Sequence, residues 1–255
     1  MVRKFIEYLK VVKKRSESTI KVYQSTLREF QRFMPITEKS WNRYLDHIAK
    51  AKPKTQKNKL NTVKEFLNWL ESNGFLKVER KFWMEAEPPK ESSLPKYLTA
   101  DEIKRLIQAC DNEFYKSLFL FLANTGLRIA EALSLTMDDI TLDGETARIR
   151  VRGKGNKERI LNVNSKIVEQ AIKAGVFTRK ITPRAVQMAI KKYAEKAGIK
   201  KRITPHVLRH SFAIMLVERN VPINKVQALL GHSNVATTSI YLKVASESIS
   251  VPQLV

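Results

Sequence analysis

The chain contains one cysteine, Cys110, among its 255 residues, so it can form no internal disulfide. A lone thiol is typical of proteins in a reducing compartment, and we therefore expect an intracellular location. The sequence also lacks an apolar run long enough to cross a bilayer, and residues 1–7 hold no sustained apolar core like that of a secretory signal. These absences argue against a membrane protein and against a secreted protein stabilised by disulfides.

Acidic residues are scarce relative to basic ones. The chain has 47 Lys and Arg against 25 Asp and Glu, a formal net charge of +22. Residues 1–100 hold 22 basic and 11 acidic residues, and residues 101–255 hold 25 and 14, so each part contributes +11. Because neutralised phosphates release counterions and add affinity, a nucleic acid is the natural partner. A lysine-rich surface, common in proteins from hot environments, is the alternative that charge alone leaves open.

Apolar residues in the first part of the chain recur at intervals of three and four, as on one face of a helix. Such stripes run through residues 5–12, 20–33, 41–48 and 60–70. They predict a small bundle of about four helices, which we assign to a domain of residues 1–85. A basic run without acidic residues lies before the last stripe. It is either a solvated loop or, as we favour, a segment that faces phosphates, with Lys50, Lys52, Lys54, Lys57 and Lys59 as its lysines.

Residues 86–95 contain three prolines and show no periodicity. Proline removes a hydrogen-bond donor and favours extended backbone, so this segment is interpreted as a linker to a second domain, residues 96–255. That domain opens on a capping box, in which Thr99 caps a helix and Glu102 reaches back, ahead of an apolar stripe that includes Cys110. Cys110 is accordingly interpreted as a core residue rather than a reactive thiol.

The second domain changes its period midway. Residues 114–123 are nearly all apolar and predict a buried helix, which Gly126 ends. From 147 to 152 apolar and basic residues alternate as in a half-exposed strand, and 159–163 is interpreted as the return strand of a hairpin. Thr-Pro pairs at 182–183 and 204–205 then begin two more helices. The predicted fold class is mainly α with a small antiparallel β-sheet.

Two pairs of residues suggest phosphate chemistry. His206 and Arg209 lie three apart and so share a helix face; histidine can transfer a proton near neutral pH, and arginine can grip a phosphate with two donors. Surface pairs at this spacing are common, so alone the pair is weak evidence. Arg128 follows the glycine that ends an apolar helix, so partial burial is expected, with Glu131 as counter-charge. That pair is either a structural ion pair or an arginine held rigid for an anion.

Other candidates also have an ordinary interpretation. Lys154 lies at the predicted hairpin turn and is either a solvated lysine or a cation that reaches into a substrate. Tyr241, nine residues beyond His232, is by itself typical of a core or rim position. His206, His210 and His232 could together bind a metal, but the chain lacks the glutamate of the zinc-hydrolase motif and places an arginine between the first two. No metal site is therefore predicted.

Taken in chain order, these residues resemble the active-site set of the tyrosine recombinase/integrase family, most closely its bacterial and archaeal Xer-type members. The matching stretches are 125–133, 153–159, 205–212 and 229–233, together with 18–23 in the first domain and 94–99 at the domain junction. They cover nearly the whole chain, and their order is far more specific than any one stretch. The resemblance implies a two-domain architecture with a SAM-like helical core-binding domain and an α+β catalytic domain.

The resemblance implies roles around the scissile phosphate. Tyr241 would attack it and form a 3′-phosphotyrosine, leaving a 5′-hydroxyl. Arg128 and Arg209 would hold its non-bridging oxygens, and Glu131 would orient Arg128. Because the phosphotyrosine keeps the bond energy of the phosphodiester, the strand could be resealed without ATP. Fixed positive charge would do the work that a metal does elsewhere, so no cofactor is expected.

The remaining matched residues complete the implied site. Lys154 would protonate the departing 5′-oxygen, His206 would act on the tyrosine proton, and His232 would hydrogen-bond the phosphate. The chain departs from the family in two places. It is shorter between residues 163 and 182 than typical Xer proteins, and only fourteen residues follow Tyr241, in a region that in the family often docks on a neighbouring protomer.

The implied partner is double-stranded DNA at a specific recombination site, bound by a homotetramer on paired sites, with a cytoplasmic, nucleoid-associated location and no membrane. The role would be dimer resolution or integration of mobile DNA. Two other functions stay open at this point. A monomeric type IB topoisomerase-like enzyme would use much the same residues, although the helical bundle favours recombination. A non-catalytic DNA-binding protein is the second alternative, against which the presence of Tyr241 argues.

Overall fold

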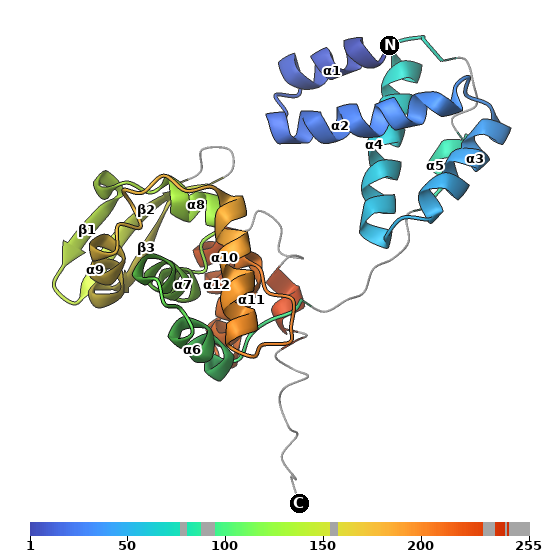
Figure 1. Ribbon diagram of the computed structural model, residues 1–255. Coiled ribbons are helices and arrows are strands. Elements are labelled where there is room, and N and C mark those ends of the chain that lie inside the picture. Colours follow the sequence, from blue (N-terminus) through green and yellow to red (C-terminus); the bar gives the residue numbers. More distant parts are fainter. Residues whose placement is uncertain (77–80, 88–94, 154–157, 232–237, 243, 245–255) are drawn as a thin grey trace, which may run out of the picture. The chain divides into compact units, whose positions relative to one another are not determined.

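The computed structural model describes residues 1–76, 81–87, 95–153, 158–231, 238–242 and 244. They divide into two compact units, residues 1–93 and 94–255, each with its own hydrophobic core (Figure 1). Most of the predicted linker, residues 86–95, lies outside the described residues. The limits of the two domains therefore stay a prediction.

The first unit is helical. Its elements are α1 (Val2–Val11), α2 (Glu17–Phe30), a 3₁₀ turn (Gln31–Phe33), α3 (Glu38–Ala49), α4 (Pro53–Ser72) and the single-turn α5 (Lys81–Met84). The long α4 contacts α1, α2 and α3, so it is the central support of the bundle. The predicted apolar stripes face inward and build an aromatic-rich core, whose largest buried side chains include Phe5, Phe30, Trp41, Tyr44 and Phe66.

The second unit is built around α7 (Glu113–Thr125). This helix contacts α6 (Ala100–Gln108), α9 (Ser165–Lys173), α10 (Pro183–Lys196) and α11 (Pro205–Glu218). Because neighbours cover it on several sides, its apolar residues are not confined to one stripe, which is the pattern of a buried helix. The other helices are α8 (Ile129–Ser134) and α12 (Ile223–Leu230), with a 3₁₀ turn at Met137–Asp139, and residues 238–242 are also helical.

Three antiparallel strands form the sheet, in the order β1 (Ile140–Asp143), β2 (Thr146–Arg152) and β3 (Glu158–Asn164). In β2 the apolar residues are buried and the arginines between them are exposed, because successive side chains of a strand point to opposite faces. Arg152 pairs with Glu158 across the hairpin, so the sheet fixes the chain on both sides of the segment that carries Lys154. Helices α7 and α9 pack against the strands.

The fold class predicted from the sequence is confirmed, but three elements were missed. Strand β1 is four residues long, too short for alternation to be recognised. Helix α9 carries an apolar stripe of Ile167, Val168, Ala171 and Ile172, but it begins directly after β3 with no loop to separate the two elements. Helix α5 is a single turn. The capping box at the start of α6 is present, with Thr99 and Glu102 bonding each other's backbone N–H groups.

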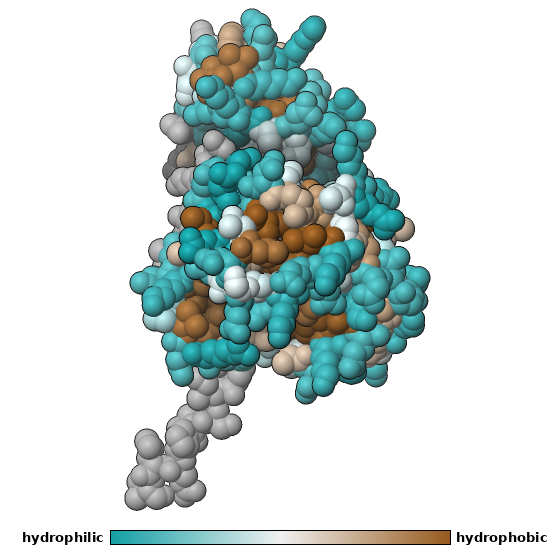
Figure 2. Space-filling model, turned by 90° about the vertical axis from the view of Figure 1, so that its left-hand side faces the viewer, coloured by the Kyte–Doolittle hydropathy of each residue, from teal (hydrophilic) through white to brown (hydrophobic). Residues whose placement is uncertain are grey.

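Hydrophilic side chains cover most of the face shown in Figure 2, with separate apolar patches between them. Exposed apolar side chains of the second unit include Leu142, Ile160 and Met188, and scattered exposure of this kind is normal for a folded protein. None of the described helices combines the length and the hydropathy that a bilayer span requires.

The Tyr44 hydroxyl is buried without a hydrogen-bond partner among the described residues. An unsatisfied buried polar group costs about 1–3 kcal/mol, so we expect Tyr44→Phe to leave the stability of the first unit unchanged or to raise it. Urea unfolding followed by tryptophan fluorescence measures this directly, because Trp41, Trp69 and Trp83, the three tryptophans of the chain, all lie in this unit.

Tyr23→Phe is the matched control. The Tyr23 hydroxyl donates to Glu65 Oε2 at 2.6 Å, so its removal should lower stability by about 1–2 kcal/mol. If Tyr44→Phe lowers the urea midpoint as much as the control does, the Tyr44 hydroxyl has a partner in solution and the expectation is wrong.

Candidate active site

Four of the predicted site residues gather in the second unit from elements far apart in the chain. Arg128 occupies the N-cap position of α8 and Glu131 lies in the first turn of that helix. Arg209 lies within α11, and Tyr241 lies in the helical segment 238–242. The Tyr241 hydroxyl contacts His210, which follows Arg209 on α11, and Arg209 and Arg128 both approach Glu131. Two further predicted residues, at positions 154 and 232, lie outside the described residues.

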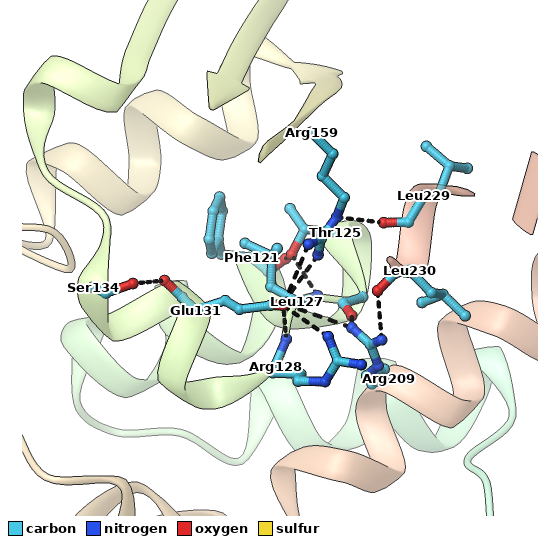
Figure 3. A network of polar contacts seen from close by, with 11 residues as sticks. Phe121, Thr125, Leu127, Arg128, Glu131, Ser134, Arg159, Arg209, Leu229 and Leu230 are labelled. Carbon is cyan, nitrogen blue, oxygen red and sulfur yellow. Dashed lines mark hydrogen bonds and ion pairs between the residues drawn. The ribbon is translucent and has the colours of Figure 1, made fainter. Parts of the chain in front are cut away.

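The centre of the cluster is the Glu131 carboxylate, which is only 7% exposed (Figure 3). It accepts from Arg128 Nη1 at 2.8 Å and from the Arg128 backbone N–H at 2.9 Å. Arg159 donates to its two oxygens at 3.0 and 3.3 Å, and Arg209 Nη1 lies 3.8 Å from Oε2. A buried carboxylate is tolerable only with such partners, because an unpaired charge in the interior is costly.

The cluster carries more positive than negative charge. Among the described residues, the ion pairs of Arg128, Arg159 and Arg209 all go to Glu131, and one carboxylate neutralises one guanidinium. Arg128 is also 35% exposed, so part of the surplus charge is accessible from solvent. An anion is the complementary ligand for such an arrangement.

Arg209 is held by main-chain oxygens. Its Nη1 donates to the carbonyl of Gly126 at 2.7 Å and its Nη2 to that of Leu230 at 2.6 Å, the ends of α7 and α12. Gly126 has a left-handed backbone (φ 61°), and a Cβ there would overlap the ring of Phe212. Only glycine fits this position, because both the backbone conformation and the space exclude a side chain.

Arg159 is a residue of the site that the sequence analysis did not single out. It lies in β3, it is 13% exposed, and its Nε donates to the Leu229 carbonyl at 2.9 Å while its terminal nitrogens bond Glu131. It therefore ties the strand after the hairpin to α8 and to the end of α12. The sequence offered two indications of Arg159, its place in the matching stretch 153–159 and the alternation of polar and apolar residues in β3. Neither indicates that its side chain meets a buried carboxylate.

Burial and charge shift the pKa values of the cluster in opposite directions. Burial alone would raise the pKa of Glu131, but hydrogen bonds from Arg159 and Arg128 hold it below its ordinary value, so the group is an anion at neutral pH. Burial, with the charge of Arg128, lowers the pKa of Arg209 to about 10. Arg209 is therefore still a cation at neutral pH.

Tyr241 is 1% exposed, and its hydroxyl lies 2.9 Å from Nδ1 of His210. Burial raises the pKa of Tyr241, and the charges of Arg209 and Arg128 oppose that rise. The sequence analysis considered His210 only as a metal ligand. No group of three or more His, Cys, Asp or Glu side chains that could hold a metal occurs in the described part of the chain, and His232 lies outside it.

His206 lies exposed one turn before His210 on α11 and borders a groove of about 1000 Å³. The groove runs along α10, and its basic lining residues include Arg184, Lys191 and Arg202. Ile129, next to Arg128 in the sequence, also lines it. Basic walls beside an anion-binding cluster suit a polyanion that continues beyond the bound group.

The lysine-rich run of the first unit is helical from Pro53 onward, so its interpretation as a loop is wrong there. Proline fits the first turn of α4, where its missing N–H costs nothing. Four of the lysines are exposed, whereas the Lys59 ammonium lies 2.6 Å from Glu29 Oε1 and both side chains are about three-quarters buried. The four exposed lysines are Lys50, Lys52, Lys54 and Lys57.

Replacing Glu131 by glutamine should destabilise the second unit strongly. An uncharged amide leaves buried guanidiniums without a counter-ion, and breaking a buried ion pair costs about 3–5 kcal/mol. The pKa of Glu131 is lower in the folded state than in the unfolded state. The wild type should therefore exceed the variant in unfolding free energy by the full amount above the unfolded-state pKa, and the difference should disappear as the pH falls through the folded-state pKa. Urea unfolding by far-UV circular dichroism at several pH values measures both effects.

Glu113→Gln is the control, because Glu113 is an exposed residue of α7 paired with Lys116, and such surface pairs contribute little. Equal urea midpoints for wild type and Glu131→Gln at neutral pH would show that the carboxylate does not hold the arginines together.

Comparison with known proteins identifies the family. Residues 96–248 match the phage integrase family, and residues 2–74 match the phage integrase N-terminal SAM-like domain. Tyrosine recombinase XerA of Thermococcus onnurineus is 34% identical, across 94% of this chain and 89% of that protein. The crystal structure of the XerH site-specific recombinase bound to palindromic difH substrate, a post-cleavage complex, has a TM-score of 0.80 at 19% identity, covering 97% of this chain and 81% of that one.

The crystal structure of a lambda integrase tetramer bound to a Holliday junction shares the fold, with a TM-score of 0.74 at 18% identity over 92% of this chain and 75% of that one. The family resemblance that the sequence motifs indicated is confirmed. The chain, with its buried Glu131, its arginines and its tyrosine, belongs to the phage integrase family and is a site-specific tyrosine recombinase that acts on DNA.

Proposed function

We propose that this recombinase cleaves a DNA strand by attack of Tyr241 Oη on the scissile phosphorus, which forms a 3′-phosphotyrosine and releases a 5′-hydroxyl. The observation that carries the proposal is geometric: the Tyr241 hydroxyl contacts His210, the residue after Arg209 on α11, and Arg209 and Arg128 meet at the Glu131 carboxylate. A tyrosine with its ordinary pKa near 10 is mostly neutral at pH 7. Cationic neighbours and a proton acceptor are what turn it into a nucleophile.

In this proposal Arg128 and Arg209 bind the non-bridging oxygens of the phosphate. A guanidinium has five N–H donors, and the two that Arg209 gives to carbonyls leave others for the anion. Phosphoryl transfer depends on positioning and on positive charge where negative charge grows, and fixed guanidiniums supply both. Glu131 is the residue that fixes them, and the reaction proceeds without a metal or a nucleotide.

The two residues outside the described part of the chain keep the roles that the family resemblance gives them. Lys154 donates a proton to the departing 5′-oxygen, and His232 hydrogen-bonds the phosphate. Resealing is the reverse reaction, in which a 5′-hydroxyl displaces Tyr241 and the phosphotyrosine bond supplies the energy. His206, which borders the groove, keeps the role of acting on the tyrosine proton that the family resemblance gives it.

The substrate that we propose is duplex DNA at a specific recombination site, bound by four protomers on two paired sites. The crystal structures of XerH bound to difH substrate in a post-cleavage complex and of a lambda integrase tetramer bound to a Holliday junction support this assembly. Resolution of chromosome or plasmid dimers and integration of mobile DNA use the same chemistry, and both lie within the proposal. A cytoplasmic location at the nucleoid follows from the substrate.

Tyr241→Phe should abolish covalent attachment to DNA and leave binding nearly intact, because it removes the attacking oxygen and little else. A nicked duplex that lets the cleaved fragment diffuse away traps the covalent complex, which denaturing gels detect in EDTA and without ATP. A pool of genomic fragments from the source organism supplies the unknown site. A denaturation-resistant complex with the phenylalanine variant would assign the nucleophile to another residue.

The products separate recombination from simple nicking and resealing. Paired sites should yield strands joined between two duplexes, whereas relaxed circles alone would indicate a topoisomerase-like activity. Salt-sensitive binding with no covalent product on any fragment of the pool would indicate a DNA-binding protein without catalysis.

The exposed lysines near the start of α4 should contribute to DNA binding through phosphates. Log K falls as log salt rises, and each phosphate contact adds about 0.9 to the magnitude of that slope. The double variant Lys54→Ala/Lys57→Ala should therefore reduce the magnitude of the slope by about 2. Lys59→Ala should leave the slope nearly unchanged and lower the stability of the first unit, because Lys59 is paired with Glu29. Fluorescence anisotropy between 50 and 200 mM salt, roughly the range in which such contacts are lost, measures the slopes.

An unchanged slope in the double variant would remove this run from the DNA-binding surface. A lower slope in Lys59→Ala, with unchanged stability, would place Lys59 on the DNA rather than in its ion pair.

A further inference from the structure

Arg159 differs from the other two arginines of the cluster because protein oxygens accept hydrogen bonds from all three of its nitrogens. Its Nε donates to the Leu229 carbonyl at 2.9 Å, and its Nη1 and Nη2 donate to the two oxygens of Glu131 at 3.3 and 3.0 Å (Figure 3). The Arg159 side chain is 13% exposed, whereas that of Arg128 is 35% exposed. Arg159 therefore faces the protein rather than a bound anion.

Arg159 and Arg209 hold the same two features of the fold. Arg209 Nη2 donates at 2.6 Å to the carbonyl of Leu230, the residue after the one that Arg159 bonds at the end of α12. Arg209 Nη1 lies 3.8 Å from Oε2 of Glu131, the same oxygen to which Arg159 Nη2 donates. Both guanidiniums thus set the spacing between Glu131 and the end of α12. Without Arg159, Arg209 alone would hold that spacing.

The position of the Arg159 guanidinium is tightly defined at both ends of the side chain. Its backbone lies in β3 opposite Val151, a fully buried residue of the central strand β2. Its guanidinium packs against Gly231, the left-handed residue that ends α12 (φ 64°). A Cβ at position 231 would lie 2.9 Å from Arg159 Nη1, which is closer than real Cβ atoms come, so this approach requires glycine.

We propose that Arg159 is a positioning residue of this recombinase. It fixes Arg128 through the shared carboxylate and Arg209 through the end of α12, so that both guanidiniums keep the places from which they bind the scissile phosphate. The inference rests on the proposed function and adds a residue to which the family resemblance gave no role. A misplacement of about 1 Å caused by a change far from the chemistry can cost about 10²-fold in rate, so the contribution of such a residue is measurable.

Two substitutions separate the charge of Arg159 from its geometry. Arg159→Gln removes both, and folding should survive because Glu131 keeps Arg128 and Arg209 as partners. Arg159→Lys keeps the charge. An ammonium is a point charge on a flexible stem, however, and it cannot replace a planar fork that bonds a carboxylate and a carbonyl at once.

The first measurement is the single-turnover rate of covalent-complex formation on the nicked duplex, with protein in excess. We expect a fall of about 10²-fold for Arg159→Gln, with DNA affinity unchanged because Arg159 faces the protein. Arg159→Lys should restore most of the stability that Arg159→Gln loses in urea, but not the rate. Arg148→Gln is the matched control, because Arg148 lies in β2 in an exposed ion pair with Asp143, and its rate should equal that of the wild type.

A substrate with a methyl group in place of one non-bridging oxygen of the scissile phosphate distinguishes misplaced arginines from a general defect. Such a methylphosphonate lacks one of the oxygens that Arg128 and Arg209 bind in the proposed reaction, and it carries one negative charge less. The ratio of wild-type to variant rate should therefore be about tenfold smaller on this substrate than on natural DNA, for Arg159→Gln as for Arg128→Ala. A loss of folding or of tyrosine placement would lower the rates on both substrates equally and leave the ratio unchanged.

Three results would overturn the inference. Wild-type rates in Arg159→Lys would show that Arg159 supplies charge rather than geometry. A rate ratio that stays the same on the methylphosphonate would assign the defect to something other than the two phosphate-binding arginines. A rate for Arg159→Gln within about threefold of the wild type would show that the cluster keeps its arrangement without Arg159. If Arg159→Gln does not fold, the lysine variant carries both tests.

Failure of the proposed function has a different signature. If the wild type forms no covalent complex, or if Tyr241→Phe still forms one, the proposed function fails and this inference fails with it. Failure of the inference alone shows only in the Arg159 variants, while the wild type and Tyr241→Phe behave as expected. The two failures are therefore distinguishable.

Discussion

The carboxylate of Glu131 is the counter-ion on which the arrangement of the second unit depends. Guanidinium groups from the start of α8, from β3 and from α11 converge on it, and they would repel one another if the carboxylate were absent. Removing one such group from water is costly, and the cost of gathering three is met only because hydrogen bonds and opposite charge replace the lost solvent. Surplus positive charge remains, and an anion such as a phosphate is the ligand that would neutralise it.

The sequence predicted the members of this cluster better than their contacts. Arg128, Arg209 and Tyr241 were identified because each stands in a motif with a recognisable order. Arg159 and His210 were not, because their importance comes from partners 28 and 31 residues away. Periodicity identifies the buried face of a helix or strand, but it does not say which polar side chain meets another across the core.

The same limit applies to the fold. Long amphipathic helices such as α2 and α4, and the alternating strand β2, were predicted because their side chains repeat at the period of the element. Strand β1 is too short to show a period and is stable as the partner of β2, whereas α9 has an apolar stripe but follows β3 without a loop that would mark its start. The lysine run was interpreted as a phosphate-facing segment, with a solvated loop as the alternative, and the helix that Pro53 begins was not predicted there because its first residues are nearly all polar.

Arg209 receives its position from main-chain carbonyls at the ends of two helices rather than from neighbouring side chains. A carbonyl oxygen is present whatever residue supplies it, so the positions around Arg209 can change in evolution without removing its anchors. Gly126 is the exception, since a side chain there would meet Phe212. Divergence can therefore reach most of the surrounding sequence while this guanidinium stays in place, which suits a fold that XerH and lambda integrase share with this chain at less than a fifth identity.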